Sequence, residues 1–312
     1  GYKLAFCEQQ EERKRMERDR LFDAIVSGKL SLSEMLLKGQ EHNLHLSAPM
    51  YNLILFQIRV SDNLEQYSDM GVIFDEKLKR EFDGAKDIVS FNRLSEGYAF
   101  LILGNDPEEL EHKIQSYTKC LVSLVKSCQG MEYFGGVGIP VCRLSEIRAS
   151  FKAASKAYAG RYMLEYNQIL RAEEALKVHE DSGSISLEGM DLTKLSRDIV
   201  PNFLRNGSVS EVRYFVEEYL QACGSNFESL IFRQYILMDI YLAVNEFLLQ
   251  LGMDQEQVAR ELGDAKTMQP CTGSEEAAAR YARDILKKAI AFRADCSQKK
   301  YRQVLDKAKE YI

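Results

Sequence analysis

The sequence lacks several patterns by which common classes of protein are recognised. Its seven cysteines include no CxxC pair, and Cys and His never cluster at the short spacing of a zinc site. The formal net charge of the 312 residues is −6, so the basic surface that binds DNA or RNA is missing. We therefore expect a reduced, cytoplasmic protein without a metal or cofactor site, whose 312 residues make no direct nucleic-acid contact.

Long uncharged apolar runs are missing too. The most apolar stretch, residues 230–252, is interrupted by Arg233, Asp239 and Glu246. It predicts a buried helix of a soluble protein rather than a membrane span, so we expect no membrane contact. Because this helix is apolar nearly all round, it is typical of the centre of a bundle or of a dimer interface, and lining a ligand pocket is the less common alternative.

The composition that is present is ordinary for a globular protein, with 46% hydrophobic and 28% charged residues. A chain of 312 residues is long enough for two domains, each with its own core. The N-terminal segment is strongly charged up to Arg20 and then turns apolar, which predicts a connecting helix that stops near Gly28.

The first half of the chain alternates strand and helix patterns. Strands are predicted over residues 52–60, 87–94, 97–104 and 132–141, and a tight hairpin turn at Ser95, Glu96 and Gly97 joins the second to the third. Helices are predicted over residues 64–82, after an Asp106 cap with Pro107 in the first turn, and over residues 145–158. The β-α-β-β-α-β-α order predicts an α+β fold: a ferredoxin-like, four-stranded sheet with helices on one face.

The second half contains only helical patterns. A polar segment rich in Gly and Ser, residues 179–191, is the best linker. The pattern after it predicts an all-α helical domain. Its helices are expected over residues 192–205, 209–223, 227–251, 255–262, 274–292 and 298–312.

One short segment is rich in glycine. Gly135, Gly136 and Gly138 lie in the sequence GGVGIP, which has neither the GK[ST] of a phosphate loop nor the GxGxxG spacing of a dinucleotide site. We therefore predict a strand on which a helix packs closely, or a bulge, rather than a phosphate site. Cys120 and Cys128 are predicted as buried positions of one helix.

The segment from Gly135 to Tyr162, GGVGIPVCRLSEIRASFKAASKAYAGRY, resembles the last strand and helix of GGDEF-type nucleotide cyclase domains. Its small residues Ala153, Ala154, Ala157 and Ala159 stand where the family has them. The resemblance places the five signature positions of the family in the predicted hairpin. They are Leu94, Ser95, Glu96, Gly97 and Tyr98, of which only the aromatic residue and the apolar strand after it match.

This departure bears on activity. Cyclisation of a nucleoside triphosphate needs carboxylates that hold two metal ions. The first predicted strand offers Gln57 and Arg59 but no acid, and Asp62 comes after its end. Glu96 alone cannot hold a pair of metal ions. The resemblance therefore implies a cyclase-like fold without cyclase activity and with no catalytic, cofactor-binding or metal-binding residues.

The whole layout resembles the centre of a YesN-type response regulator of the AraC family. The resemblance divides the chain into a connecting helix (1–28), a degenerate GGDEF-like α/β domain (29–178), an all-α helical domain (179–298) and the start of a C-terminal DNA-binding domain (299–312). A phosphoreceiver domain and most of the DNA-binding domain would then lie outside these 312 residues.

This resemblance implies a non-enzymatic signal-transmission and dimerisation region of a bacterial two-component regulator of transcription. The expected partners are a second copy, paired through helices, and a sensor kinase and DNA, bound through domains outside the chain. The alternative is a degenerate GGDEF domain that senses a nucleotide or other small molecule by binding it without turnover.

Overall fold

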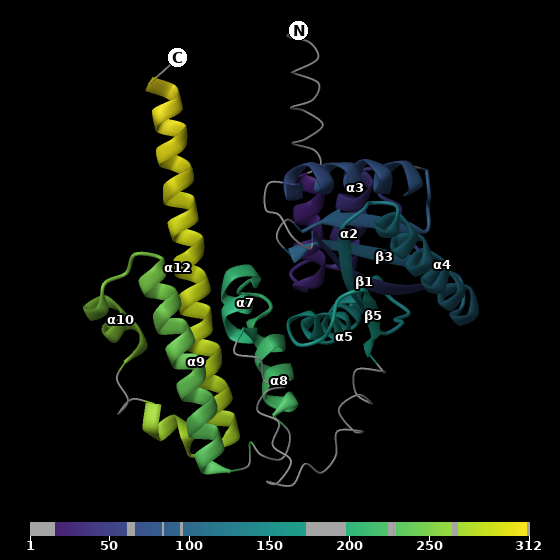
Figure 1. The fold of residues 1–312 in the computed structure, drawn as a ribbon. Coiled ribbons are helices and arrows are strands. Elements are labelled where there is room, and N and C mark those ends of the chain that lie inside the picture. The colour runs from purple at the N-terminus through teal and green to yellow at the C-terminus, as the bar shows by residue number, and fades with distance from the viewer. Residues whose placement is uncertain are drawn as a thin grey trace. The chain divides into compact units, whose positions relative to one another are not determined.

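The computed structural model describes residues 16–60, 66–82, 84–93, 96–172, 198–223, 227, 229–263 and 268–310. The chain forms two compact units, residues Gly1–Leu176 and Lys177–Ile312 (Figure 1). The first is α+β and the second, over its described residues, is helical. The charged segment before Met16 and the predicted linker 179–191 fall outside the described residues.

The first unit is built on a mixed sheet of five strands in the order β2-β3-β1-β4-β5. The strands are β1 (Met50–Val60), β2 (Ile88–Asn92), β3 (Tyr98–Gly104), β4 (Met131–Val137) and β5 (Gln168–Arg171). The pairs β2–β3, β3–β1 and β1–β4 are antiparallel, and β4–β5 is parallel. The prediction of four strands was wrong because β5 is short and only half-buried, so it lacks the apolar pattern of the others.

Helices cover both faces of the sheet, so the prediction of helices on one face was also wrong. One face packs against α3 (Gln66–Phe82) and α4 (Pro107–Lys126). The other packs against a helix over residues 16–26, α2 (Leu32–Glu41) and α5 (Ile147–Ala159), which follows η2 (Leu144–Glu146) and precedes η3 (Gly160–Tyr162). Strand β3 is buried at all seven positions and β1 at seven of eleven, because these strands have a core on each side.

The helix over residues 16–26 is part of this second core. Leu21, Phe22, Ile25 and Val26 are all buried against the sheet, and the Phe22 ring centroid lies 5.1 Å from that of Phe91 on β2. The described part of the predicted connecting helix therefore packs into the α/β core. The helix ends where predicted, because Gly28 has a φ of +71° and its amide donates to the Ile25 carbonyl oxygen.

Side chains at helix starts explain two of the helices. The prediction for α4 is confirmed: Asp106 is its N-cap, its carboxylate accepts from the Glu109 amide at 2.8 Å, and Pro107 follows in the first turn. Helix α2 was not predicted, although Ser31 and Glu34 form a reciprocal capping box at its start.

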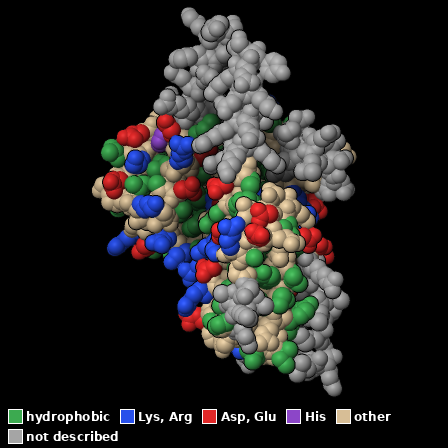
Figure 2. All heavy atoms as spheres, turned by 90° about the vertical axis from the view of Figure 1, so that its left-hand side faces the viewer, with side chains coloured by type: hydrophobic (Ala, Val, Ile, Leu, Met, Phe, Trp, Pro, Cys, Tyr) green, Lys and Arg blue, Asp and Glu red, His purple; other side chains and the backbone are tan. Residues whose placement is uncertain are grey.

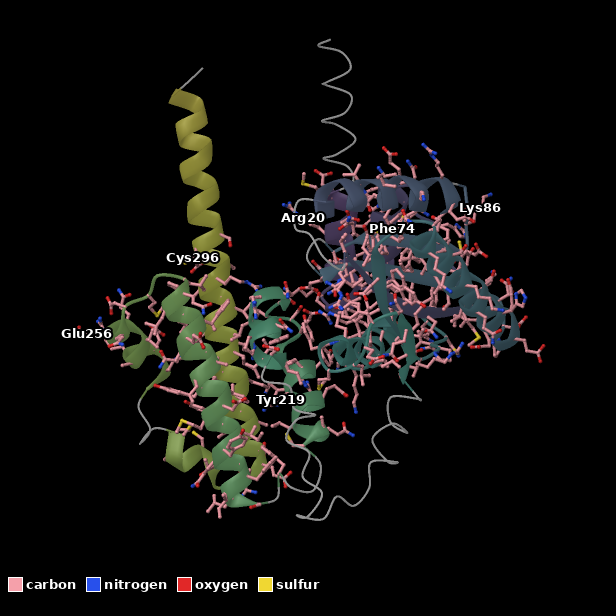
Figure 3. All side chains as sticks on the ribbon, in the orientation of Figure 1. Arg20, Phe74, Lys86, Tyr219, Glu256 and Cys296 are labelled. Carbon is pink, nitrogen blue, oxygen red and sulfur yellow. The ribbon has the colours of Figure 1, made fainter. Side chains whose placement is uncertain are left out.

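The second unit contains α7 (Ile199–Asn206), α8 (Val212–Ala222), α9 (Leu230–Gln250), α10 (Gln255–Leu262), η6 (Gln269–Thr272) and α12 (Glu275–Glu310). Helix α9 packs along α12 and also against α7 and α10 (Figure 1). The two helices predicted over 274–292 and 298–312 are one continuous helix through Glu310, so no break stands at the expected domain boundary after residue 298. Figure 3 labels Phe74 and Tyr219, a buried aromatic residue from each unit.

Within the described residues, every helix is too short or too polar to cross a membrane.

Candidate functional site at the β2–β3 turn

The predicted signature positions lie at one end of the sheet, where strands begin and end. The register pairs Phe56 with Tyr98 and Val60 with Met131, so the C-terminal end of β1 and the starts of β3 and β4 lie at this end of the sheet. The turn from β2 to β3 lies here as well. Leu94 and Ser95 fall outside the described residues, and Glu96, Gly97 and Tyr98 are described.

Backbone hydrogen bonds close the turn on itself. The Arg93 amide donates to the Gly97 carbonyl oxygen at 2.7 Å, and the Glu96 amide donates to the Arg93 carbonyl oxygen at 3.1 Å. Gly97 has a φ of +85°, a conformation that favours glycine, and a Cβ there would lie 2.4 Å from the Phe56 carbonyl oxygen. Glycine at this position is therefore required by the close approach of β1, and the position is packed against protein.

Helix α5 contacts the turn through the side chain of Tyr158. Tyr158 is almost fully buried, and its hydroxyl donates to the Glu96 carbonyl oxygen at 2.8 Å. The same hydroxyl would lie 3.0 Å from a Cβ on Gly97. The turn thus rests on a side chain that comes from a different element of the fold.

The Glu96 carboxylate has an internal partner. It forms an ion pair with the Arg93 guanidinium, whose side chain is 8% exposed. That guanidinium lies 5.6 Å from the ring centroid of Phe22, in the helix over residues 16–26, and 5.5 Å from that of Phe151 on α5. The carboxylate at the described signature position is therefore neutralised by a buried cation that also contacts both neighbouring helices.

Tyr98, the aromatic residue that matches the family pattern, points into the opposite core. Its side chain is 7% exposed, and its hydroxyl donates to Asp75 on α3 at 2.7 Å. Its ring centroid lies 5.5 Å from that of Phe74 and 6.2 Å from that of Phe100. Tyr98 is therefore a core residue of the α3 and α4 face.

The end of β1 carries a cation where the resemblance calls for a metal-binding carboxylate. The Arg59 Nε donates to the Glu132 carboxylate on β4 at 2.7 Å, and its guanidinium carbon lies 3.4 Å from the Tyr166 ring centroid. Asp62, the next acid along the chain, falls outside the described residues. The end of β1 therefore carries an Arg–Glu ion pair at the position where the resemblance would put a metal-binding carboxylate.

The glycine segment explains how α5 comes so close to the sheet. A Cβ on Gly136 would lie 2.5 Å from the Ala154 carbonyl oxygen, and one on Gly138 would lie 2.4 Å from the Ser150 carbonyl oxygen. Ala154 and Ser150 are both fully buried on α5. The prediction that these glycines let a helix pack closely on a strand is confirmed, and this contact brings Tyr158 under the turn.

The cysteines and the acids show no metal chemistry in the described part of the chain. There, no three His, Cys, Asp or Glu side chains are placed to hold a metal ion. Cys120 is half-buried on α4, and burial raises the pKa of its thiol to about 11. Cys128 is buried but lies beyond the end of α4 at Lys126, so the prediction that both cysteines share one helix was wrong.

Sequence reasoning missed the residues that close the turn. It placed Glu96, Gly97 and Tyr98 at the site but gave no role to Arg93 or Tyr158. The pattern of small residues on α5 indicated close helix packing, yet it carried no signal that a tyrosine hydroxyl would reach a turn 62 residues away.

Comparisons of this chain with protein-family models and with curated proteins find no match.

Proposed function

We propose that this chain is a non-enzymatic signal-transmission region of a bacterial two-component response regulator that controls transcription. The observation that carries the proposal is the closed β2–β3 turn. Glu96 is paired with Arg93, and the Tyr158 hydroxyl binds the Glu96 carbonyl oxygen. A turn closed by its own backbone, by the Arg93–Glu96 ion pair and by a tyrosine of α5 supports a position without a catalytic role.

The strand order supports the GGDEF-like part of the proposal. A β-α-β-β-α-β chain whose four strands lie in the order β2-β3-β1-β4, all antiparallel, has the arrangement expected of a ferredoxin-like sheet. The strand β5 extends this sheet beside β4. The finer assignment, to a degenerate nucleotide cyclase domain, rests on the resemblance of residues 135–162 and on the position of the turn.

The contacts of the turn support a route for a signal. Asp19, in the helix over residues 16–26, accepts a hydrogen bond from the Asn92 amide at 3.0 Å, and Phe22 of the same helix lies beside Arg93. In this proposal, a shift of that helix changes the packing of the turn and of α5. Two alternative packings of such a core give a switch that is biased from the N-terminal side.

The remaining parts of the proposal concern domains outside the 312 residues. A phosphoreceiver domain would take the signal from a sensor kinase, and an AraC-type domain would bind DNA in the cytoplasm. The net charge of −6 supports a connector better than a DNA reader.

The enzymatic part is tested with GTP and magnesium, using an active GGDEF cyclase as the positive control. We expect no cyclic dinucleotide product, and no rise in melting temperature or heat of binding with GTP or cyclic di-GMP. Product formation would overturn the proposal. Binding without turnover would favour the alternative, a nucleotide-sensing domain.

The regulatory part is tested by reading the gene on both sides of this segment. We expect a phosphoreceiver sequence upstream and a helix-turn-helix sequence of the AraC type downstream. If no DNA-binding sequence follows Ile312, the transcriptional role is wrong.

A further inference from the structure

Helix α9 exposes a row of large apolar side chains. Ile231, Tyr235, Met238, Leu242 and Leu249 have exposed fractions of 77%, 49%, 38%, 56% and 37%. We call these five residues the α9 seam. Hydrophobic side chains are visible on the lower part of the molecular face that Figure 2 presents.

The seam is separate from the side of α9 that forms the core of its own unit. Phe232, Ile236, Leu237, Ile240, Val244, Phe247 and Leu248 are buried. At 100° per residue they lie on the side opposite the seam, where α9 packs on α7, α10 and α12. The helix therefore has two apolar sides, and only one of them is needed to hold the unit together.

The spacing of the seam fits a partner helix. Its members follow one another at intervals of four, three, four and seven residues, and the half-buried Asn245 fills the gap in the last interval. This is the alternating three- and four-residue pattern by which one helix packs along another. A scattered set of exposed apolar residues would not keep to one stripe over 19 positions of a helix.

The residues beside the seam allow the partner to have the same sequence. The flanking side chains include Gln234, Asp239, Tyr241 and Glu246, and they carry only two charges. In a parallel pair of α9 helices, heptad geometry places each acid beside a Gln or Tyr of the other copy, whereas an antiparallel pair would place acid beside acid, so we expect the parallel arrangement. Asn245 adds the single polar seam position that commonly fixes the register of paired helices.

The area is also sufficient. The exposed fractions of the seam equal about two and a half fully exposed side chains, on the order of 500 Å² per copy. Pairing two copies would bury about 1,000 Å² before the flanking residues are counted, which is the size at which specific interfaces begin. We propose that the α9 seam is a self-association surface that pairs with the α9 seam of a second copy of this chain.

This inference rests on the proposed function for its biological role, because it gives the expected dimer a surface. It is tested by sedimentation velocity of the 312-residue chain over a wide range of concentrations. We expect a reversible dimer, and we expect Leu242→Glu to weaken it by about 100-fold or more, because a symmetric dimer loses the same contact twice. Ile231→Glu, at the most exposed position of the seam, should weaken the dimer in the same direction.

The matched control is Leu37→Glu on α2, where the side chain is 59% exposed against 56% for Leu242. It should leave the dimer intact. Circular dichroism and melting temperature show whether each variant folds. If Leu242→Glu does not fold, Ile231→Glu provides the test.

Two results would overturn the inference. One is a wild-type chain that stays monomeric at every concentration. If Leu242→Glu also lowers the melting temperature of such a monomer, the seam is covered by another part of the same chain. The other is a dimer that both seam variants leave unchanged. Neither result alters the outcome of the GTP and cyclic di-GMP measurements, so failure of this inference is distinguishable from failure of the proposed function.

Discussion

On the sheet face covered by α3 and α4, aromatic rings pack on rings, whereas on the other face, beside the Phe22 and Phe91 rings, the backbone of α5 lies directly against the sheet. The first face has Phe56 with its ring centroid 6.5 Å from that of Phe74 and 6.4 Å from that of Phe100. On the second, Gly136 and Gly138 leave no room for a Cβ against α5. Side chains can change rotamer to accommodate a substitution, but helix and strand backbones cannot. The contacts at Gly136 and Gly138 therefore fix how close α5 lies to the sheet.

The closed β2–β3 turn depends on the backbone contact of α5. Tyr158 reaches the β2–β3 turn because α5 lies directly on β4. The closed turn is thus a consequence of the glycine contacts on one face, while on the other face Tyr98 donates a hydrogen bond to Asp75.

The largest effect is expected at the backbone contact. Gly136→Ala places a methyl group 2.5 Å from the Ala154 carbonyl oxygen, so α5 or β4 has to move. We expect a loss of about 1–3 kcal/mol in the free energy of unfolding, measured with urea.

The control for Gly136→Ala is Gly71→Ala on α3, where a Cβ meets nothing within 4 Å. The same chemical change should there stabilise the chain by about 0.5–1 kcal/mol, because alanine is the better helix former. Equal effects of the two substitutions would show that α5 does not depend on the glycines.

An intermediate effect is expected at the turn. Tyr158→Phe removes the hydroxyl that donates to the Glu96 carbonyl oxygen. We expect a loss of about 1 kcal/mol in the free energy of unfolding and faster hydrogen exchange at the Glu96 and Gly97 amides. Tyr133→Phe, in the core of the other face, is the matched control and should leave exchange at the turn unchanged. If exchange at the turn is the same in both variants, Tyr158 does not hold the turn closed.

The smallest effect concerns the pH dependence of stability at Asp87, which contacts two side chains of α4. Burial of Asp87 disfavours its charge, but hydrogen bonds from Tyr117 at 2.6 Å and from Lys113, whose Nζ lies 3.1 Å from Oδ2, leave the pKa of this carboxyl below its ordinary value. A lowered pKa stabilises the fold above the ordinary pKa, and that stabilisation is lost as the pH falls through the lowered value.

Asp87→Asn should therefore melt below the wild type at pH 7, and the gap should narrow as the pH falls below 3.8, the ordinary pKa of the carboxyl. Thermal melts across this pH range measure the gap. A gap that stays constant into the acid range would mean that the charge of Asp87 contributes nothing to stability.

The sequence was sufficient to place the elements with clear local signals. Asp106 and Pro107 predicted the start of α4, and the apolar runs located the first four strands. The glycines were also interpreted correctly, because a Gly cluster without GK[ST] or GxGxxG indicates close packing.

Other features depend on tertiary contacts that leave little trace in the local pattern. Strand β5 pairs in parallel with β4 but is only half-buried, so its four residues carry no apolar alternation. The α9 helix could be predicted as apolar all round, but only the fold separates its core side from its exposed seam. Helix α2 is different: the Ser31 and Glu34 spacing is a local signal that went unused.

The hydrogen bond between Tyr158 and Glu96 also has a consequence for the order of folding. The two residues are 62 positions apart, so the turn takes its final form only after β4 and α5 have docked. Contacts between distant segments form late because closing a long loop is unfavourable until other contacts reward it. Weakening this bond should therefore speed unfolding while leaving the folding rate nearly unchanged. The closed turn would then form after the folding transition state and slow the unfolding of the first unit.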